Sequence, residues 1–210
     1  AAAWVFFRRA ATCRGAPFGA LGAGRAMVVV CLAEPALLLG LFSASLVSRS
    51  PSLPTTVETL AHRELAIYPA LAFAGIAFII VAIAENSRIP VDNPATHLEL
   101  TMIHEAMILE YSGRHLAVIE AAAALKLLLY FSLISCMFVP WGMASAEGDV
   151  AAFSIGLVSY VTKLAMGGFL LAVFETATAK MRVFRVSDFL GAAVMLGLLA
   201  TLLLFVSQSV

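Results

Sequence analysis

The chain has 210 residues and is 62% hydrophobic but only 12% charged, whereas a soluble domain carries about 25% charged residues. Its formal net charge of zero gives no electrostatic basis for binding nucleic acid. The three cysteines form no Cys-x-x-Cys pair, which argues against a zinc or iron–sulfur site in this chain alone.

Five apolar runs have the length of about twenty residues that a bilayer-spanning helix needs, and the mean hydropathy is +0.99. We therefore predict an all-α, polytopic membrane protein with a single transmembrane domain over residues 1–210. Residues Ala1–Phe7 resemble the end of another apolar segment, so we expect the sequence to be incomplete at its N-terminus. Pro51 and Pro54 predict a loop after the first span. In chain order, the five predicted spans are Met27–Val47, Ala66–Ala84, Leu116–Pro140, Phe153–Ala179 and Phe189–Ser207.

Basic residues are distributed unequally between the two sides of these spans. Cytoplasmic loops carry an excess of Lys and Arg, so the richer side is expected to be cytoplasmic. This orientation makes residues 85–115 a cytoplasmic loop and places the C-terminus on the outer side. The richer side holds Arg8, Arg9, Arg14, Arg25, Arg88, Arg114, Lys180, Arg182 and Arg185, and the other side holds Arg49 and Arg63.

The stretch Ala84–Gly113 is much more polar than the rest of the chain. Pro90 and Pro94 exclude regular helix in its first part, because proline lacks an N–H donor and disfavours the helical conformation of the preceding residue. Residues 95–111 have the pattern of an amphipathic helix, which would lie at the membrane surface or enter a protein-lined cavity. A solvated loop with paired charges is the competing interpretation.

The spacing of polar residues in this stretch excludes the commonest metal motifs. His104 and Glu105 are not followed by a second histidine, since Ile108 stands at that position, and no Glu-x-x-His pair is present. A metal site made by His97 and His104 is geometrically possible, but we predict none.

Six ionisable residues lie within or at the ends of the predicted spans. A charged side chain at the bilayer centre costs about 2.5–3.5 kcal/mol on insertion scales, so such residues usually face protein or water. The carboxylates would lie in the cytoplasmic half and the lysines nearer the middle of the membrane, which suits a proton path; structural ion pairs and snorkelling are the competing interpretations. The relay candidates are Glu34, Glu85, Glu120, Lys126, Lys163 and Glu175.

The polar stretch also carries a long, specific motif. It reads Arg88-Ile89-Pro90-Val91-Asp92-Asn93-Pro94-Ala95-Thr96-His97-Leu98-Glu99-Leu100, followed by Glu110-Tyr111-Ser112-Gly113. This motif resembles the membrane-anchor subunit of group 4 nickel–iron hydrogenase complexes, a family that includes formate hydrogenlyase subunit 4 and hydrogenase-4 component C and is related to complex I subunit 1. Weaker similarity at Leu32–Leu37 and Glu175–Arg185 extends the resemblance over nearly the whole chain.

The resemblance implies an architecture, partners and a role. The five spans would be the last five of eight, in the cytoplasmic (inner) membrane of a prokaryote. The chain would bind no cofactor and hold no catalytic centre. It would join an iron–sulfur small subunit, a nickel–iron large subunit and antiporter-like membrane subunits, and would couple electron transfer to proton or sodium movement. The junction with the redox arm would be formed by Arg88, Asp92, His97, Glu99, His104, Glu105 and Glu110.

Two positions separate this chain from the quinone-binding relatives. The complex I version has acidic residues soon after the proline, in its quinone cavity, whereas this chain has Ala95 and His97. We therefore expect an ion-coupling anchor of a hydrogenase or formate hydrogenlyase complex. The alternative is a quinone-binding subunit of a complex I-like NADH dehydrogenase. A stand-alone cation or solute transporter, which should show internal repeats and helix breaks at the midplane, is a third hypothesis.

Overall fold

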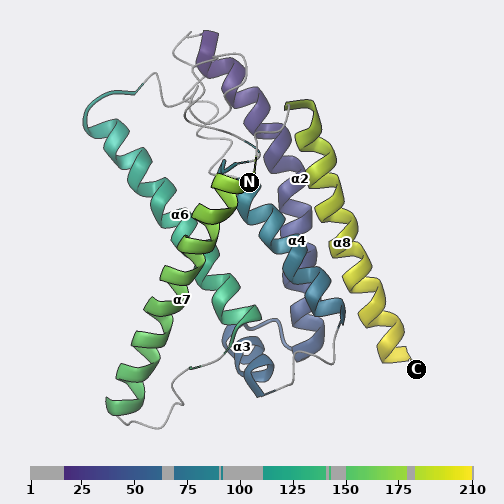
Figure 1. Ribbon diagram of the computed structural model, residues 1–210. Helices are drawn as coiled ribbons and strands as arrows, with labels where there is room; N and C mark the ends of the chain where they lie inside the picture. Colours follow the sequence, from purple (N-terminus) through teal and green to yellow (C-terminus); the bar gives the residue numbers. More distant parts are fainter. Residues whose placement is uncertain are drawn as a thin grey trace.

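The computed structural model describes residues 17–62, 69–89, 91, 111–140, 142, 150–178 and 183–209. Within these ranges the chain forms six helices and no strand, so the predicted all-α fold is confirmed. Figure 1 shows the helices as an elongated bundle. They are α2 (Pro17–Ser48), α3 (Leu53–His62), α4 (Pro69–Glu85), α6 (Arg114–Phe138), α7 (Val150–Ala177) and α8 (Val183–Ser209).

Four of the helices in the described ranges are long and apolar enough to cross a membrane. They correspond to the first, third, fourth and fifth predicted spans, whose positions are confirmed to within a few residues. The four candidate spans are Ala26–Ser48, Arg114–Phe138, Phe153–Ala177 and Arg185–Ser207.

The second predicted span, Ala66–Ala84, corresponds to the shorter apolar helix α4. Its 17 residues extend about 25 Å at 1.5 Å per residue, slightly less than the roughly 30 Å of a bilayer's hydrocarbon core. Nevertheless, α4 is deeply buried, and Phe78 and Val81 are fully inaccessible to solvent. Its position between α2, α8 and α6 makes it the central helix of the described bundle.

The loop predicted after the first span is in fact partly helical. Pro51 precedes α3 and Pro54 lies in its first turn, where the missing N–H of proline does not interrupt a helical hydrogen bond. The backbone N–H and the hydroxyl of Thr56 both donate to the carbonyl of Ser52, at 3.0 and 2.9 Å. Leu60, which is 2% exposed, packs against the bundle. The prolines therefore begin a short amphipathic helix.

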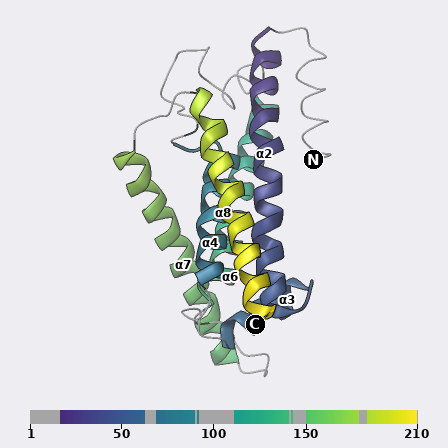
Figure 2. The same ribbon diagram turned by 90° about the vertical axis from the view of Figure 1, so that its right-hand side faces the viewer.

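Helices α2, α4 and α8 pack closely because their contact surfaces consist largely of small residues. Ala33 and Ala36 of α2 and Ala193 of α8 are fully buried together with Val81 and Leu190. In a bilayer, small residues let helix backbones approach, so that van der Waals contact and not water exclusion holds the helices together. Figures 1 and 2 both show α2 and α8 side by side along most of their length.

Helices α6 and α7 pack less extensively on this core. Phe78 of α4 stacks at an angle against Tyr130 and Phe138 of α6, with ring centroids 5.9 and 6.2 Å apart. Helix α7 packs mainly against α6, where Phe131 lies directly on Gly167. None of the residues in the candidate span of α7 is buried. Its apolar surface is therefore open to contact with lipid.

Replacement of Gly197 by leucine should destabilise the bundle. A Cβ atom at this position would lie 3.1 Å from Leu39 Cβ, so the side chain would push α8 away from α2. Overpacking of this kind costs about 1–3 kcal/mol. Gly191→Leu is the matched control, because a Cβ atom there meets nothing within 4 Å and the gain in helix propensity is the same. In one detergent, Gly197→Leu should unfold at a lower temperature than Gly191→Leu. Equal unfolding temperatures would contradict the close packing of α2 and α8.

Candidate functional site

A Schellman motif terminates α4 and fixes the polar residues that follow it. Ser87 has a positive φ of 51°, and its N–H donates to the carbonyl of Ala84 at 3.1 Å. The N–H of Arg88 donates to the carbonyl of Ile83 at 3.1 Å. This pattern satisfies carbonyls that have no partner within the helix. Glu85 and Arg88 consequently leave the end of α4 in defined directions.

The turn after α4 is also anchored in the hydrophobic core. The N–H of Val91 donates to the carbonyl of Arg88 at 2.9 Å. The Val91 side chain is 1% exposed and belongs to the cluster that joins Ala84 to Ala26 of α2 and Val186 of α8. These neighbours place the end of α4 level with one end of the α2 and α8 spans.

Glu85 forms an ion pair with Lys126 in the middle of α6. The ammonium donates to the Glu85 side chain at 2.5 Å and to its backbone carbonyl at 2.7 Å. The Glu85 side chain is only 7% exposed and that of Lys126 is 31% exposed. The positive charge of Lys126 also interacts favourably with the negative end of the α4 dipole. The pair therefore fixes α6 to the end of α4.

A second ion pair connects the same turn to α7. A guanidinium nitrogen of Arg88 lies 3.6 Å from Glu175 Oε1, and the side chains are 42% and 24% exposed. Glu175 lies near the last turn of α7. Glu85 and Arg88 lie in the same turn of chain but contact different helices. The negative charge of Glu85 contacts α6, and the positive charge of Arg88 contacts α7.

Tyr130 lies beside the first of these ion pairs. It is one turn beyond Lys126 on α6 and is 8% exposed. The carboxylates of Glu85 and of Glu34 on α2 both act electrostatically on its hydroxyl. Glu34 precedes Pro35, whose ring removes one N–H donor from α2. Tyr130 packs with Phe78 and Ala82 of α4, and Leu37 of α2 lies against the same cluster. Its position one turn from Lys126 is the signal by which the sequence could have identified it.

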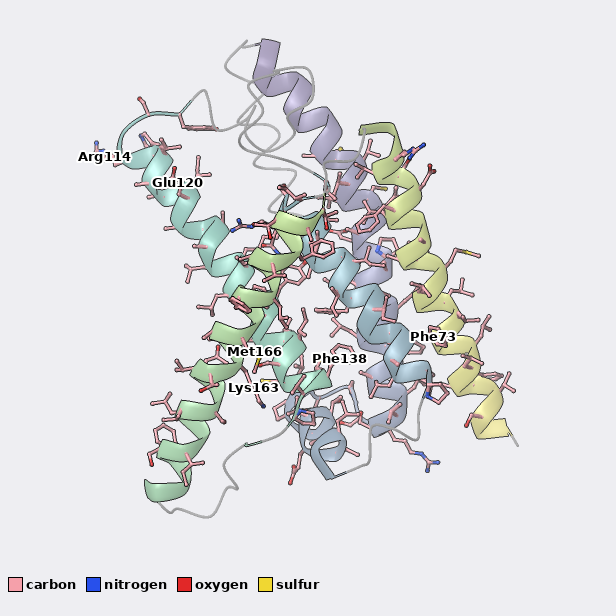
Figure 3. The ribbon with its side chains drawn as sticks, in the orientation of Figure 1. Phe73, Arg114, Glu120, Phe138, Lys163 and Met166 are labelled. Carbon is pink, nitrogen blue, oxygen red and sulfur yellow. The ribbon has the colours of Figure 1, made fainter. Side chains whose placement is uncertain are left out.

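Two other relay candidates lie away from this group. Glu120 is exposed, and Figure 3 shows it near Arg114 on the end of α6 that extends beyond α4. Lys163 lies toward the opposite end of the bundle, where its ammonium donates to the carbonyl of Val139 at 2.6 Å. Of the six candidates, the structure brings Glu85 together with Lys126 directly, and places Glu34 and Glu175 close by.

Most of the predicted junction residues lie outside the described residues. Arg88 is the exception, because it occupies the turn after α4. The others are Asp92, His97, Glu99, His104, Glu105 and Glu110, and the amphipathic helix predicted at residues 95–111 falls mainly in the same range.

The chemistry available at the end of α4 is proton exchange between side chains. Carboxylate, ammonium and phenol groups can each bind or release a proton. Among the residues that the structure describes, no cluster of three His, Cys, Asp or Glu side chains could hold a metal ion. We therefore treat Glu34, Glu85, Lys126 and Tyr130, with the neighbouring pair of Arg88 and Glu175, as the candidate site.

Comparison with known proteins agrees with the resemblance in the sequence. The family described as NADH dehydrogenase matches residues 3–207. Formate hydrogenlyase subunit 4 of Escherichia coli (strain K12) is 31% identical over 182 residues, which cover 87% of this chain and 58% of that protein. Hydrogenase-4 component C of the same organism is 31% identical over 180 residues, 84% of this chain and 55% of that protein. The chain thus spans a little over half the length of these curated relatives.

Both the family match and the helices of membrane-spanning length agree with a multi-pass membrane protein. The chain therefore belongs to the NADH dehydrogenase family of complex I subunit 1, and it is homologous to formate hydrogenlyase subunit 4 and hydrogenase-4 component C.

Proposed function

We propose that this chain is the membrane anchor and ion-translocation coupling subunit of a multisubunit hydrogenase or formate hydrogenlyase complex. The observation that carries the proposal is the pair of salt bridges at the end of α4, which connects α6 and α7 to the start of the Arg88 motif. The names of the two homologues, formate hydrogenlyase subunit 4 and hydrogenase-4 component C, describe them as components of such enzymes. The chain itself would hold no cofactor or catalytic centre.

The coupling would begin in the turn after α4. Residues 85–115 would form a cytoplasmic loop, and Arg88 would lie at its junction with an iron–sulfur small subunit and a nickel–iron large subunit. A displacement of this loop moves Arg88 and Glu85 together, because one Schellman motif holds both. Since buried charges tolerate loss of their partners poorly, separation of Glu85 from Lys126 would favour transfer of a proton. Electron transfer in the partner subunits would in this way drive movement of protons or sodium.

The membrane topology follows from the same proposal. Helices α2, α4, α6, α7 and α8 would all cross the inner membrane of a prokaryote, and would correspond to the last five of eight spans. Helix α4 could do so despite its length, since a short helix can be accommodated by local bilayer thinning at modest cost. Its burial between other helices favours this arrangement. The C-terminus would lie on the outer side, and antiporter-like subunits would cover exposed faces.

A quinone-binding subunit of an NADH dehydrogenase is the second candidate, because the matched family bears that enzyme's description. Ala95 and His97 argue against it, since they replace acidic residues of the quinone-binding relatives. Labelling of residues 95–110 by a photoreactive quinone would favour this candidate over the hydrogenase anchor.

Mild solubilisation from native membranes should yield the chain together with other subunits. We expect iron–sulfur clusters and nickel in the same fraction, measured by metal analysis and by mass spectrometry of the subunits. A chain that purifies alone under conditions that preserve known membrane complexes would contradict the anchor role and favour a stand-alone transporter.

Replacement of Glu34 or Glu85 by glutamine should impair ion pumping more than hydrogen evolution. A positioned proton-transfer group contributes roughly 10²–10⁴-fold to a rate, so we expect a loss of at least about tenfold in pumping. Pumping and hydrogen evolution can be measured together in proteoliposomes that contain the complex. Glu120→Gln is the matched control, because Glu120 is exposed and remote from the site. Normal pumping in Glu34→Gln would remove that residue from the relay.

The Glu85–Lys126 pair should show strong energetic coupling. Lys126→Met leaves a nearly buried carboxylate without its cation, which should reduce stability by about 3–5 kcal/mol. The double variant Glu85→Gln/Lys126→Met should recover part of this loss, and Arg114→Met, on the exposed end of α6, should have little effect. Thermal unfolding in one detergent of the wild type, Lys126→Met, Glu85→Gln, the double variant and the Arg114→Met control provides the measurement. Additive effects of the two substitutions would show that the pair contributes no stability.

A further inference from the structure

Two cavities adjoin each other beside α6 and α7. The larger, of about 420 Å³, lies between α4, α6 and α7. The smaller, of about 220 Å³, lies between the end of α6, the chain at Gly142 and the first half of α7. Ser135 and Lys163 line both cavities. The two spaces therefore meet at this pair of side chains.

The larger cavity extends from the candidate site to the far end of α6. Its lining includes Leu127, which follows Lys126, and Tyr130, on whose hydroxyl the Glu85 carboxylate acts electrostatically. It continues along α6 as far as Val139. From Leu127 to Val139 is about 18 Å at 1.5 Å per residue, and the whole of α4 extends about 25 Å on the same basis. The cavity thus covers most of the thickness of the bundle that α4 covers.

Lys163 closes the far end of the larger cavity. Its ammonium donates to the carbonyl of Val139, the residue that ends α6, at 2.6 Å. Figure 3 shows Lys163 on α7 near the end of α6 that carries Phe138. The near end has the same arrangement, because Lys126 donates to the carbonyl of the last residue of α4 at 2.7 Å. A lysine that is bound to a helix end therefore lies at each end of the cavity.

The charges along the two cavities suit protons better than sodium ions. Among the lining residues in the described part of the chain, none is Asp or Glu, and the two charged ones, Arg88 and Lys163, are cationic. Channels that pass metal cations use rings of Asp or Glu. A sodium ion would meet a fixed ammonium and no carboxylate at the junction. Ammonium and hydroxyl groups, by contrast, can exchange protons with water.

The apolar walls of the larger cavity disfavour water while both ends are closed. Apolar cavities stay dry, and a dry constriction blocks the passage of ions. At about 30 Å³ for each water molecule in the liquid, the cavity holds about fourteen waters when it fills. Opening of either end would admit this water. The cavity would then conduct protons, and it would not conduct them in the closed state.

We propose that the two cavities form the proton outlet of this subunit and that Lys163 is the gate between them. This inference rests on the proposed coupling function. Separation of Glu85 from Lys126 leaves unpaired charge beside the larger cavity and draws water into it. The Lys163 ammonium then releases one proton to water in the smaller cavity, and the resulting amine accepts one proton from water in the larger cavity. The broken N–H bond is re-formed, and one proton has moved toward the outer side.

Cysteine accessibility in membranes that contain the complex tests the gate. The reagent is a small, membrane-impermeant methanethiosulfonate on the outer side, after replacement of Cys13 and Cys31 by serine. Cys136 lines only the smaller cavity and should react. Ile134→Cys, made with Cys136→Ser, places a thiol in the larger cavity and should react at least about tenfold more slowly, as expected for a barrier of one charge-assisted hydrogen bond. Leu129→Cys is the control, because Leu129 is exposed and lines neither cavity.

Two outcomes with the unmodified gate would overturn the proposal. No reaction at Cys136 would show that the smaller cavity does not open to the outer side. Equal reaction at Cys136 and at Ile134→Cys would show that nothing closes the junction.

Substitution of Lys163 tests the gate directly. Lys163→Ala should raise the reaction rate of Ile134→Cys at least about tenfold, because the hydrogen bond that holds the junction closed is lost. Lys163→Arg keeps the charge and N–H donors and should leave the rate low. If Lys163 only stabilises the end of α6, Lys163→Ala should lower the unfolding temperature but leave the reaction rate unchanged, and the gate would be refuted.

The identity of the ion can be measured with the same variant. In Lys163→Ala the larger cavity fills with water as far as Tyr130, so that only the Glu85–Lys126 pair separates this water from the inner side. Proteoliposomes with this variant should take up protons faster than wild type, measured with a pH-sensitive dye, but should not take up sodium faster. An equal rise in sodium uptake would contradict a proton outlet.

The labelling pattern does not depend on hydrogenase activity. A chain that shows the expected pattern but purifies without redox subunits would retain the gate and contradict the anchor role. A chain that purifies with these subunits but reacts equally at both thiols would retain the anchor role and contradict the gate.

Discussion

The ion pair between Lys126 and Glu85 is the interaction on which the arrangement of the candidate site depends. One ammonium satisfies a carboxylate that is 7% exposed and also a carbonyl at the C-terminal end of α4. Because the Glu85 side chain is nearly buried, loss of the cation would leave its carboxylate without a compensating charge. The position of α6 relative to α4 is therefore set by electrostatics as well as by packing of aromatic rings.

The two halves of the bundle are held together by different forces. Small residues bring α2, α4 and α8 into close contact, which leaves little freedom for these helices to move separately. Helices α6 and α7 depend more on charged contacts from the turn after α4 and enclose a cavity with it. Polar contacts of this kind respond to protonation, whereas a close-packed apolar interface does not. This difference fits a coupling role, with α6 and α7 as the responsive elements.

Much of the fold was predictable because hydrophobic length is a strong local signal. Four of the five predicted spans coincide with long apolar helices, and the remaining one, Ala66–Ala84, corresponds to the shorter helix α4. The helix at Leu53–His62 was not predicted, because Pro51 and Pro54 are typical of a loop, although proline is compatible with the first helical turn. The family was also recognisable from the sequence, since the motif that starts at Arg88 is long and specific.

The pairing of charges was not predictable in the same way. The sequence by itself determined that Glu85, Lys126, Arg88 and Glu175 lie in or beside apolar helices, because the cost of such charges follows from local composition. Which of them meet depends on how α6 and α7 cross α4, and Lys126 is 41 residues from Glu85 along the chain. The burial of Tyr130 beside this pair, the exposure of Glu120 and the cavity beneath Arg88 likewise arise only when the helices pack, because each requires side chains from separate helices.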